Sequence, residues 1–407
     1  MNIKEEIEAS YPELVALRRH FHEHPELDRH EFETMDYIEA YLKDHGIPSV
    51  RIKDGGILGC IDSGKPGFAV LLRADIDALP IDESPTNLSK KRVCISQNPG
   101  KMHACGHDGH MAMQLVAGKI LAAHKDEFEG KVYLMFEEGE ETGSGCCFNI
   151  FKYIKDQHIH IDACYATHVR WNIPAGKVSI MPGAAMAGVF SFHIEIDGHG
   201  GHGSRPDMAK SPIDTFVSCY EAFQGIRMND ISPEATLTFS LGLVQAGHAP
   251  NVIPDTLQFE GTCRFFEEDQ GAIFHQRFVE ALDAECKRRG CTWKFLRDRV
   301  LFPVMNNPLC AKIAVDAVKE NLGEDALYDG GRWMASESFA NALARWPGIL
   351  AFTGIKDDEV GSGAAHHTAQ FDIGEKGLKT GVGTVLSYTL ALLKEKPAID
   401  FKPRVVD

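Results

Sequence analysis

The segment with the clearest chemical potential is His103-Ala104-Cys105-Gly106-His107-Asp108-Gly109-His110. Cys105 and His107 stand two residues apart beside glycines that free the backbone, so a thiolate and an imidazole can converge on one metal ion. The same residues also fit a glycine-containing turn with a core cysteine and solvated histidines. Short motifs of this kind leave both interpretations open.

A second feature is the acidic run Glu137-Glu138-Gly139-Glu140-Glu141, which follows an apolar stretch ending at Phe136. Four carboxylates at the end of a strand repel one another unless a cation neutralises them. A metal ion would do so, and a carboxylate left beside it could serve as a general base. The alternative is a solvated acidic loop, which most acidic runs are.

Isolated histidines supply the remaining candidate metal donors. His168 follows an apolar stretch, and His366 and His367 are adjacent near the C-terminus. A lone histidine is more often structural than a ligand. Sulfur, nitrogen and carboxylate donors together, however, suit zinc or manganese, so the joint pattern favours a metal site assembled from distant segments.

Three further polar residues are candidates for substrate binding. His202 lies in the glycine-rich segment Gly198–Gly203, Asn251 precedes Val252-Ile253-Pro254, and Arg264 lies in an alternating stretch. The glycine-rich segment could reach into a site or form an ordinary hairpin turn. Arg264 could hold a substrate carboxylate in a bidentate pair, or it could be a surface arginine of a strand.

The elements that must position these residues indicate two kinds of sheet. About the first 180 residues alternate helical and buried-strand patterns, typical of a mostly parallel sheet covered by helices. Helical spacing runs over 7–42 with a break near His24-Pro25, and the same α/β patterns return after residue 301. The other segments expected here are buried strands at 68–72, 131–136 and 349–353, and helices at 110–124, 311–321 and 378–394.

From residue 189 the apolar residues alternate strictly, which predicts antiparallel strands with one wet face. Two helices are expected between them, one over 211–226 with Ser211 as N-cap and one over 270–289 ending at Gly290. This strand and helix order is ferredoxin-like. We therefore predict a discontinuous α/β domain (1–183 and 301–407) with a large mixed sheet, and an inserted α+β domain (184–300).

Composition excludes several classes of protein. The 407 residues include 42 Lys+Arg and 58 Asp+Glu, a net charge of −16, which disfavours nucleic-acid binding. No apolar stretch approaches the ~20 residues of a membrane-spanning helix, and the N-terminus lacks a signal-like pattern. The odd number of scattered cysteines, 11, indicates reduced thiols. We expect a cytoplasmic protein with no membrane partner.

Several motifs, in order along nearly the whole chain, resemble the amidohydrolase branch of metallopeptidase family twenty. That branch contains aminoacylases, hippurate hydrolases, auxin–amino acid conjugate hydrolases and aminobenzoyl-glutamate hydrolases. The motifs are Leu17-Arg18-Arg19, His24-Pro25-Glu26-Leu27, Arg73–Pro80, Met102–His110, Gly200-Gly201-His202 and Asn251-Val252-Ile253-Pro254.

The resemblance implies a zinc-peptidase-type catalytic domain with a ferredoxin-like lid and dimerisation domain, forming a homodimer or homotetramer. It implies hydrolysis of the amide bond of an N-acyl amino acid at two divalent ions, Mn²⁺ or Zn²⁺, with Ni²⁺ or Co²⁺ as alternatives. His367 is preferred over His366 because it holds the family's place before Phe371-Asp372. The implied metal ligands are Cys105, His107, Glu141, His168 and His367.

The resemblance also implies catalytic roles. Glu140 would take a proton from the metal-activated water and pass it to the leaving amine. Asp77 would orient a metal ligand, and His202 would bind substrate or stabilise the oxyanion, across a dimer interface. Asn251 and Arg264 complete the expected substrate-binding residues.

Some positions depart from the family pattern, and other functions stay open. Glu137-Glu138 replaces an uncharged pair, which could alter metal preference or favour a cationic substrate, and Ser338 stands in place of a carboxylate. The alternatives are a dipeptidase or other amide hydrolase on the same metals, a catalytically silent acyl-amino acid binder, and an interaction protein with structural zinc. Donors spread from Cys105 to His367 fit an open catalytic site better than a structural one.

Overall fold

The computed structural model describes residues 1–143 and 145–405. The described chain divides into two units, each with an apolar core of its own. The first unit contains Met1–Ala185, Met305–Gly331 and the described residues from Asn341 onward, and the second contains Met186–Val304 and Arg332–Ala340.

The segment Arg332–Ala340 belongs to the second unit, whereas the sequence-based division placed it in the first domain. Its contacts explain its place in the second unit. The Arg332 guanidinium lies 4.4 Å from the ring centre of Phe266, and the Ala187 N–H donates to the carbonyl of Ala335 at 2.9 Å. These contacts join residues far apart in sequence, so local patterns do not reveal them.

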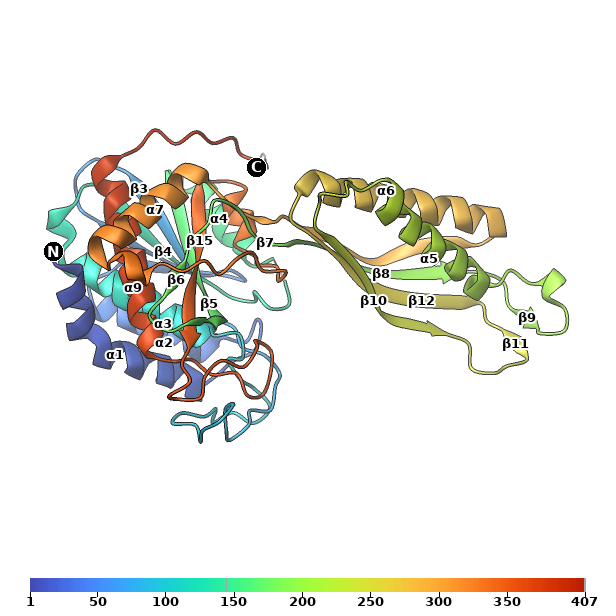
Figure 1. Cartoon of the computed structure of the whole chain (residues 1–407), viewed down its shortest axis with the longest axis horizontal. Helices are drawn as coiled ribbons and strands as arrows, with labels where there is room; N and C mark the ends of the chain where they lie inside the picture. Colours follow the sequence, from blue (N-terminus) through green and yellow to red (C-terminus); the bar gives the residue numbers. More distant parts are fainter. Residues whose placement is uncertain (144, 406–407) are drawn as a thin grey trace. The chain divides into compact units, whose positions relative to one another are not determined.

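The first unit is built on a seven-stranded sheet in the order β1-β2-β4-β3-β5-β15-β6 (Figure 1). Its four central strands, β4, β3, β5 and β15, are parallel, whereas β1, β2 and β6 pair antiparallel. The predicted large mixed α/β sheet is confirmed. The strands are β1 (Ser49–Ile52), β2 (Gly56–Asp62), β3 (Ala69–Asp75), β4 (Lys131–Glu137), β5 (Ala163–Pro174), β6 (Val178–Ser179) and β15 (Gly348–Lys356).

Helices bury this sheet. In one layer α1 packs on α3, α3 on α9 and α9 on α7, while α4 packs on β1 and β2. Every side chain of β3 is buried, as expected of a parallel strand covered on both faces. The helices are α1 (Ile3–Glu23), α2 (Phe32–Asp44), α3 (His107–Ala123), α4 (Cys147–Asp156), α7 (Pro308–Asn321), α8 (Ala340–Leu343) and α9 (Lys376–Glu395), with short 3₁₀ turns η1 (Lys125–Glu127) and η3 (Glu324–Ala326).

Because the central strands are parallel, their carboxyl ends share one edge of the sheet, which is where ligands bind in open α/β folds. Asp77 follows β3, the acidic run begins at the last residue of β4, and the segment with His367 follows β15. His168 lies within β5 and His107 in the first turn of α3. The topology thus collects the candidate donors at one edge.

The second unit contains a four-stranded antiparallel sheet in the order β10-β12-β8-β13, which is the ferredoxin-like arrangement. Ser211 caps α5 by accepting the Asp214 N–H, and α6 ends at Gly290 with φ 71°, both as predicted. Its elements are β8 (Gly188–Asp197), β9 (Gly201–His202), η2 (Pro206–Met208), α5 (Pro212–Asn229), β10 (Leu237–Ala246), β11 (Val252–Ile253), β12 (Thr256–Phe265), α6 (Glu268–Arg289) and β13 (Thr292–Leu301). Two short strands with residues of both units, β7 (Gly183–Met186) and β14 (Val304–Asn306), pair with each other.

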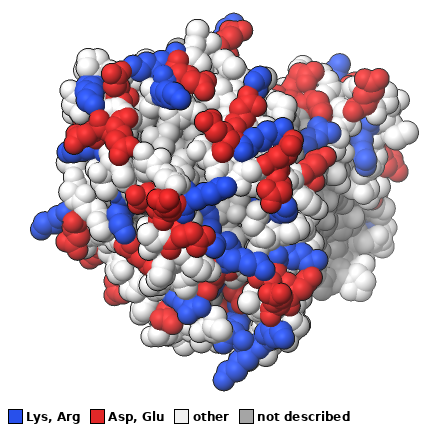
Figure 2. Space-filling view, turned by 60° about the vertical axis from the view of Figure 1, so that its left-hand side comes forward, with Lys and Arg blue, Asp and Glu red and all other residues white. Residues whose placement is uncertain are grey.

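The surface mixes charges of both signs. Figure 2 shows lysine and arginine interspersed with aspartate and glutamate over the viewed face. Within residues 1–143 and 145–405, no helix is both long and apolar enough to cross a bilayer.

The turn that starts α3 offers a test of the packing at this edge. Gly106 has φ 92°, and a Cβ there would lie 2.3 Å from the Val169 side chain, whereas Gly176 has φ 94° and open space around it. We expect Gly176→Ala to destabilise the protein by about 1–2 kcal/mol through backbone strain alone. Gly106→Ala should cost about 1–3 kcal/mol more through overpacking.

Urea unfolding monitored by tryptophan fluorescence measures both variants. Equal unfolding midpoints for Gly106→Ala and Gly176→Ala would contradict the predicted close packing against Val169.

Candidate metal centre

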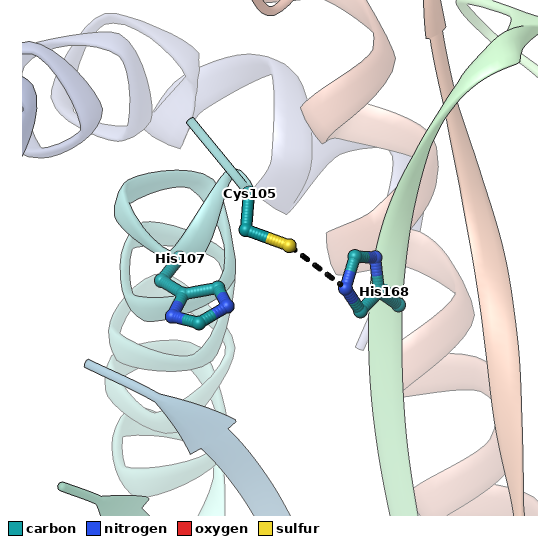
Figure 3. A group of neighbouring side chains, drawn as sticks. All are labelled: Cys105, His107 and His168. Carbon is teal, nitrogen blue, oxygen red and sulfur yellow. Dashed lines mark hydrogen bonds between the residues drawn. The ribbon is translucent and has the colours of Figure 1, made fainter. Parts of the chain in front are cut away.

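Cys105 lies at the centre of the candidate site, in the turn before α3. Its sulfur points toward the imidazole of His168 on β5, and His107 stands beside it on α3 (Figure 3). The Sγ atom is 3.6 Å from His168 Nε2, and ligand atoms of Cys105, His107 and His168 lie within 4.8 Å of one another. All three side chains are buried, so these residues form one candidate ligand group.

A second candidate group contains Cys105, Glu141 and His367. His367 Nε2 lies 3.4 Å from Cys105 Sγ and 3.3 Å from Glu141 Oε1. The His367 backbone, at φ 61°, is fixed by its N–H, which donates to the carbonyl of Ala104 at 2.9 Å. Cys105 is therefore common to both groups, and a thiolate there could contact two cations.

Asp77 positions two of these donors at once. Its Oδ1 lies 3.1 Å from His107 Nδ1, and its Oδ2 accepts the Glu141 N–H at 2.9 Å. With Nδ1 engaged, His107 presents Nε2 to the cluster. This nitrogen is buried and makes no hydrogen bond to any residue of the described chain, but it lies 3.5 Å from Asp75 Oδ2 and 3.7 Å from Glu141 Oε1. Burial lowers the pKa of His107, yet Asp75 and Asp77 raise it well above its usual value, so a bound cation would take the place of the ring proton.

The donor set fits divalent metal ions. Thiolate, imidazole and carboxylate together are typical of zinc and other first-row transition metals, and the buried Nε2 of His107 has no hydrogen-bond partner among the described residues. Burial, followed by the nearby Glu141, raises the pKa of the Cys105 thiol well above its usual value. Because a ligand thiol must be deprotonated, a bound cation would displace this proton.

Comparison with known proteins identifies the family. The model of "Peptidase family M20/M25/M40" matches residues 71–391. The chain belongs to this peptidase family. The sequence-based prediction that this protein hydrolyses amide bonds is confirmed at the level of the family.

Individual relatives are similar over most of their length. The chain is 34% identical over 355 residues to "N-acetyl-L-cysteine deacetylase" of Bacillus subtilis, covering 85% of this chain and 81% of that protein. It is 32% identical over 390 residues to "IAA-amino acid hydrolase ILR1-like 2" of Arabidopsis thaliana, covering 94% and 86%. The crystal structure of Bacillus subtilis YXEP, described as a dinuclear metal binding peptidase from the M20 family, matches with a TM-score of 0.78 and 26% identity, covering 95% and 99%.

The acidic run of this M20 chain divides among three environments. Glu137 is buried and accepts the Arg73 Nε–H at 2.7 Å. Burial, together with Asp54, raises the pKa of Glu138. Among the described residues of this run, Glu140 and Glu141 are the members of candidate ligand groups, with carboxylate oxygens within 4.8 Å of a His107 ring nitrogen. Glu137 and Glu138 are therefore outside the candidate ligand groups of the described residues, and their effect on metal preference or on the charge of the substrate stays a prediction.

The sequence analysis did not single out the buried pair of Asp75 and His110, which lies next to His107. Asp75 Oδ1 lies 2.6 Å from His110 Nδ1, and Asp75 Oδ2 accepts from Arg73 Nη1 at 2.7 Å. Burial alone would raise the pKa of Asp75, but Arg73, His107 and His110 hold it well below its usual value. The three-residue spacing of His107 and His110, which places both on one helix face, was the available signal.

His366 lies beside the cluster in a different role from His367. Its ring centre is 5.3 Å from that of His168 and 4.7 Å from that of Phe371. Burial, followed by His367, holds the pKa of His366 well below its usual value, so this ring is neutral at pH 7. The candidate ligand groups contain His367 and not His366.

The predicted substrate-binding residues all belong to the second unit. His202 on β9 pairs with Val252 of β11, next to Asn251, and its Nδ1 accepts from the Ser204 hydroxyl at 2.8 Å. Arg264 on β12 is partly buried and donates to the Ser336 hydroxyl at 2.7 Å. Contact of His202, Asn251 and Arg264 with substrate stays a prediction.

The shared position of Cys105 leads to a test of metal content. We expect Cys105→Ser to lower metal affinity by at least about tenfold to a hundredfold, because a neutral hydroxyl replaces a thiolate. Cys60→Ser is the control, since Cys60 lies on β2 and is outside every candidate ligand group of the described residues. Metal analysis after dialysis against limiting chelator measures the effect. Unchanged metal content in Cys105→Ser would remove Cys105 from the ligand set.

Proposed function

We propose that this protein hydrolyses the amide bond of N-acyl amino acids, small molecules that it binds at a centre of two divalent cations. The observation that carries the proposal is the presence of Cys105 in two ligand groups, with the carboxylate of Glu140 beside them. The printed names of the two enzymes compared above, a deacetylase of an acyl-amino acid and a hydrolase of a conjugated amino acid, support this substrate class.

The residues that would hold the two cations are those already placed around Cys105. His107 and His168 would complete one ligand group, and Glu141 and His367 the other. Mn²⁺ or Zn²⁺ suits this donor set, with Ni²⁺ or Co²⁺ as alternatives. When bound, such cations lower the pKa of water and polarise a carbonyl group.

Glu140 is the proposed general base. It lies in the turn after β4, where the Gly143 N–H donates to its carbonyl at 2.8 Å. Its half-buried carboxylate has an oxygen within 4.8 Å of ligand atoms of His107 and Glu141. It would take a proton from the attacking water and deliver it to the nitrogen of the leaving amine, so that a carboxylate and a free amino acid are released.

The second unit would supply substrate recognition. We assign His202 to the developing oxyanion, Asn251 to polar contact with the substrate, and Arg264 to the carboxylate of the amino acid. Burial, followed by Arg299, lowers the pKa of Arg264. A partly buried cation of this kind gains from an anionic ligand.

The proposed reaction is tested by amine release from a panel of N-acyl amino acids and dipeptides. The protein is stripped with chelator and reloaded with Mn²⁺ or Zn²⁺ separately. Turnover of acyl-amino acids only after reloading supports the proposal, while preference for dipeptides would reassign the site as a dipeptidase. Metal binding without turnover of any member would contradict the proposal and favour a silent binder.

Glu140 can be separated from its acidic neighbours by substitution. We expect Glu140→Gln to reduce kcat by about 10²–10⁴-fold, since the amide cannot take the proton, while both cations stay bound. Glu138→Gln, in the same run but outside the ligand groups, should keep a kcat close to that of the unchanged protein. Steady-state kinetics with metal analysis checks both, and near-normal turnover by Glu140→Gln would exclude it as the base.

We also propose that the protein forms a homodimer through the second unit. Ile213, Val217 and Tyr220 recur at helical spacing on α5 and are 41%, 50% and 41% exposed. Strand β10 is an edge of the four-stranded sheet, so its outer side can pair with a second copy. An apolar stripe and an open edge strand in one unit are typical features of an association surface.

Val217→Asp should therefore produce monomers, because it places a charge in the apolar stripe. Val300→Asp is the matched control: Val300 is 55% exposed in the same unit but lies on β13, at the opposite sheet edge. Light scattering after size-exclusion chromatography gives the molar mass. If the unchanged protein has the molar mass of a single chain, or if Val217→Asp is still a dimer, the proposed interface is wrong.

A further inference from the structure

The segment between α1 and α2 lies directly against the turn that carries Glu140 and Glu141. The Glu31 Oε1 atom accepts the Gly139 N–H at 2.9 Å. The Thr142 hydroxyl donates to Asp28 Oδ2 at 2.7 Å. These two hydrogen bonds flank the proposed base and the neighbouring ligand on both sides.

Glu31 is unusual for a carboxylate at this position. It is completely buried, and although it occupies the N-cap position of α2 its side chain makes no capping hydrogen bond. Its side chain instead reaches the turn after β4. Burying a carboxyl group away from water costs free energy. The hydrogen bond to Gly139 offsets part of this cost, and we therefore ask what the buried Glu31 contributes to the turn.

The turn depends on such a contact. Gly139 has φ 69°, a left-handed conformation that interrupts the strand and redirects the chain. Behind it, the Glu141 N–H donates to Asp77. With Glu31 on one N–H and Asp77 on the other, both amide groups around Glu140 are fixed by buried carboxyl side chains.

The charge state of Glu31 follows from its surroundings. Burial, followed by the nearby Asp77, raises the pKa of Glu31 to about 8, so at pH 7 it is mainly the neutral acid. Carboxyl oxygens of Asp28, Glu31 and Asp77 lie within 4.8 Å of one another, a crowding that a neutral Glu31 relieves. Glutamine has the shape of this neutral acid and keeps an oxygen for the Gly139 N–H.

We propose that Glu31 is a positioning residue for the hydrolytic reaction: through its hydrogen bond to Gly139 it holds the turn that places the Glu140 carboxylate beside the metal ligands. Glu31 does not contact the reacting atoms in this proposal. The inference rests on the proposed function, in which Glu140 moves the proton. A displaced base loses rate, because catalysis depends steeply on the position of the reacting groups.

The test compares Glu31→Ala, Glu31→Asp and Glu31→Gln in the metal-loaded protein, with the best substrate of the panel. Loss of the Gly139 contact in Glu31→Ala, or a side chain one methylene too short in Glu31→Asp, should lower kcat by about tenfold to a hundredfold. KM and the number of bound metals should stay unchanged. Glu31→Gln should restore a kcat close to that of the unchanged protein. Glu33→Ala, an exposed position in the first turn of α2, is the matched control.

The outcomes separate the two proposals. Absence of turnover in the unchanged, metal-loaded protein rejects the proposed function. An active protein in which Glu31→Ala and Glu31→Asp keep their kcat overturns the role of Glu31 alone. It is also overturned if Glu31→Gln loses as much kcat as Glu31→Ala, if the metals are lost together with the rate, or if both shortened variants fail to fold.

Discussion

The first unit depends on balancing charge that is buried at the carboxyl edge of its sheet. Arg73 on β3 does this next to the candidate ligands: its guanidinium lies 2.7 Å from carboxylate oxygens of both Asp75 and Glu137, and all three side chains are almost completely buried. Unpaired, each carboxylate would carry a large desolvation cost. In this arrangement Asp75 also contacts His110 and His107, so the Arg73 ion pairs hold a carboxylate next to the candidate ligand His107.

A second buried arginine ties the distant ligand segments together. Arg18 of α1 donates to Asp108 at 3.0 Å and to Asp372 at 3.1 Å. Asp108 follows His107 directly, and Asp372 follows the segment of His367. One guanidinium therefore joins two parts of the site that are separated by more than half of the chain. Arg92 adds to this by donating to the carbonyls of Ala369 and Phe371.

These supports favour the proposed catalytic centre over a structural zinc site. Structural zinc is held by closely spaced cysteines and histidines that close its coordination shell. Here the donors come from β5, from the start of α3 and from loops after β4 and β15, and they include a carboxylate. Buried arginines and Asp77 hold the donors from behind, so the metal is not needed to close a small fold. Such preorganisation is what a catalytic centre requires.

What the sequence by itself determined was largely local. Strict alternation located β8, β10 and β12, Ser211 and Gly290 marked helix ends, and the motifs pointed to Cys105 and His107, because each of these signals depends on neighbours within a few residues. Strands β1 and β2 were missed. The four residues of β1 are too few for a clear pattern, and Gly56 and Gly59 interrupt the apolar run of β2. The resemblance, carried by ordered motifs, supplied the family and the expected roles.

Only the tertiary structure decided which contacts each of several similar residues makes. Glu137, Glu138, Glu140 and Glu141 are close in sequence, yet Arg73 pairs with the first, and the last two belong to a candidate ligand group with His107 among the described residues. The placement of His367 and the contact of Glu31 with Gly139 likewise had no local signature, and the spacing of His107 and His110 did not reveal Asp75 as their partner. Parallel strands bring their carboxyl ends together across long stretches of chain, and the pairing of buried charges follows that three-dimensional neighbourhood, not the order of residues.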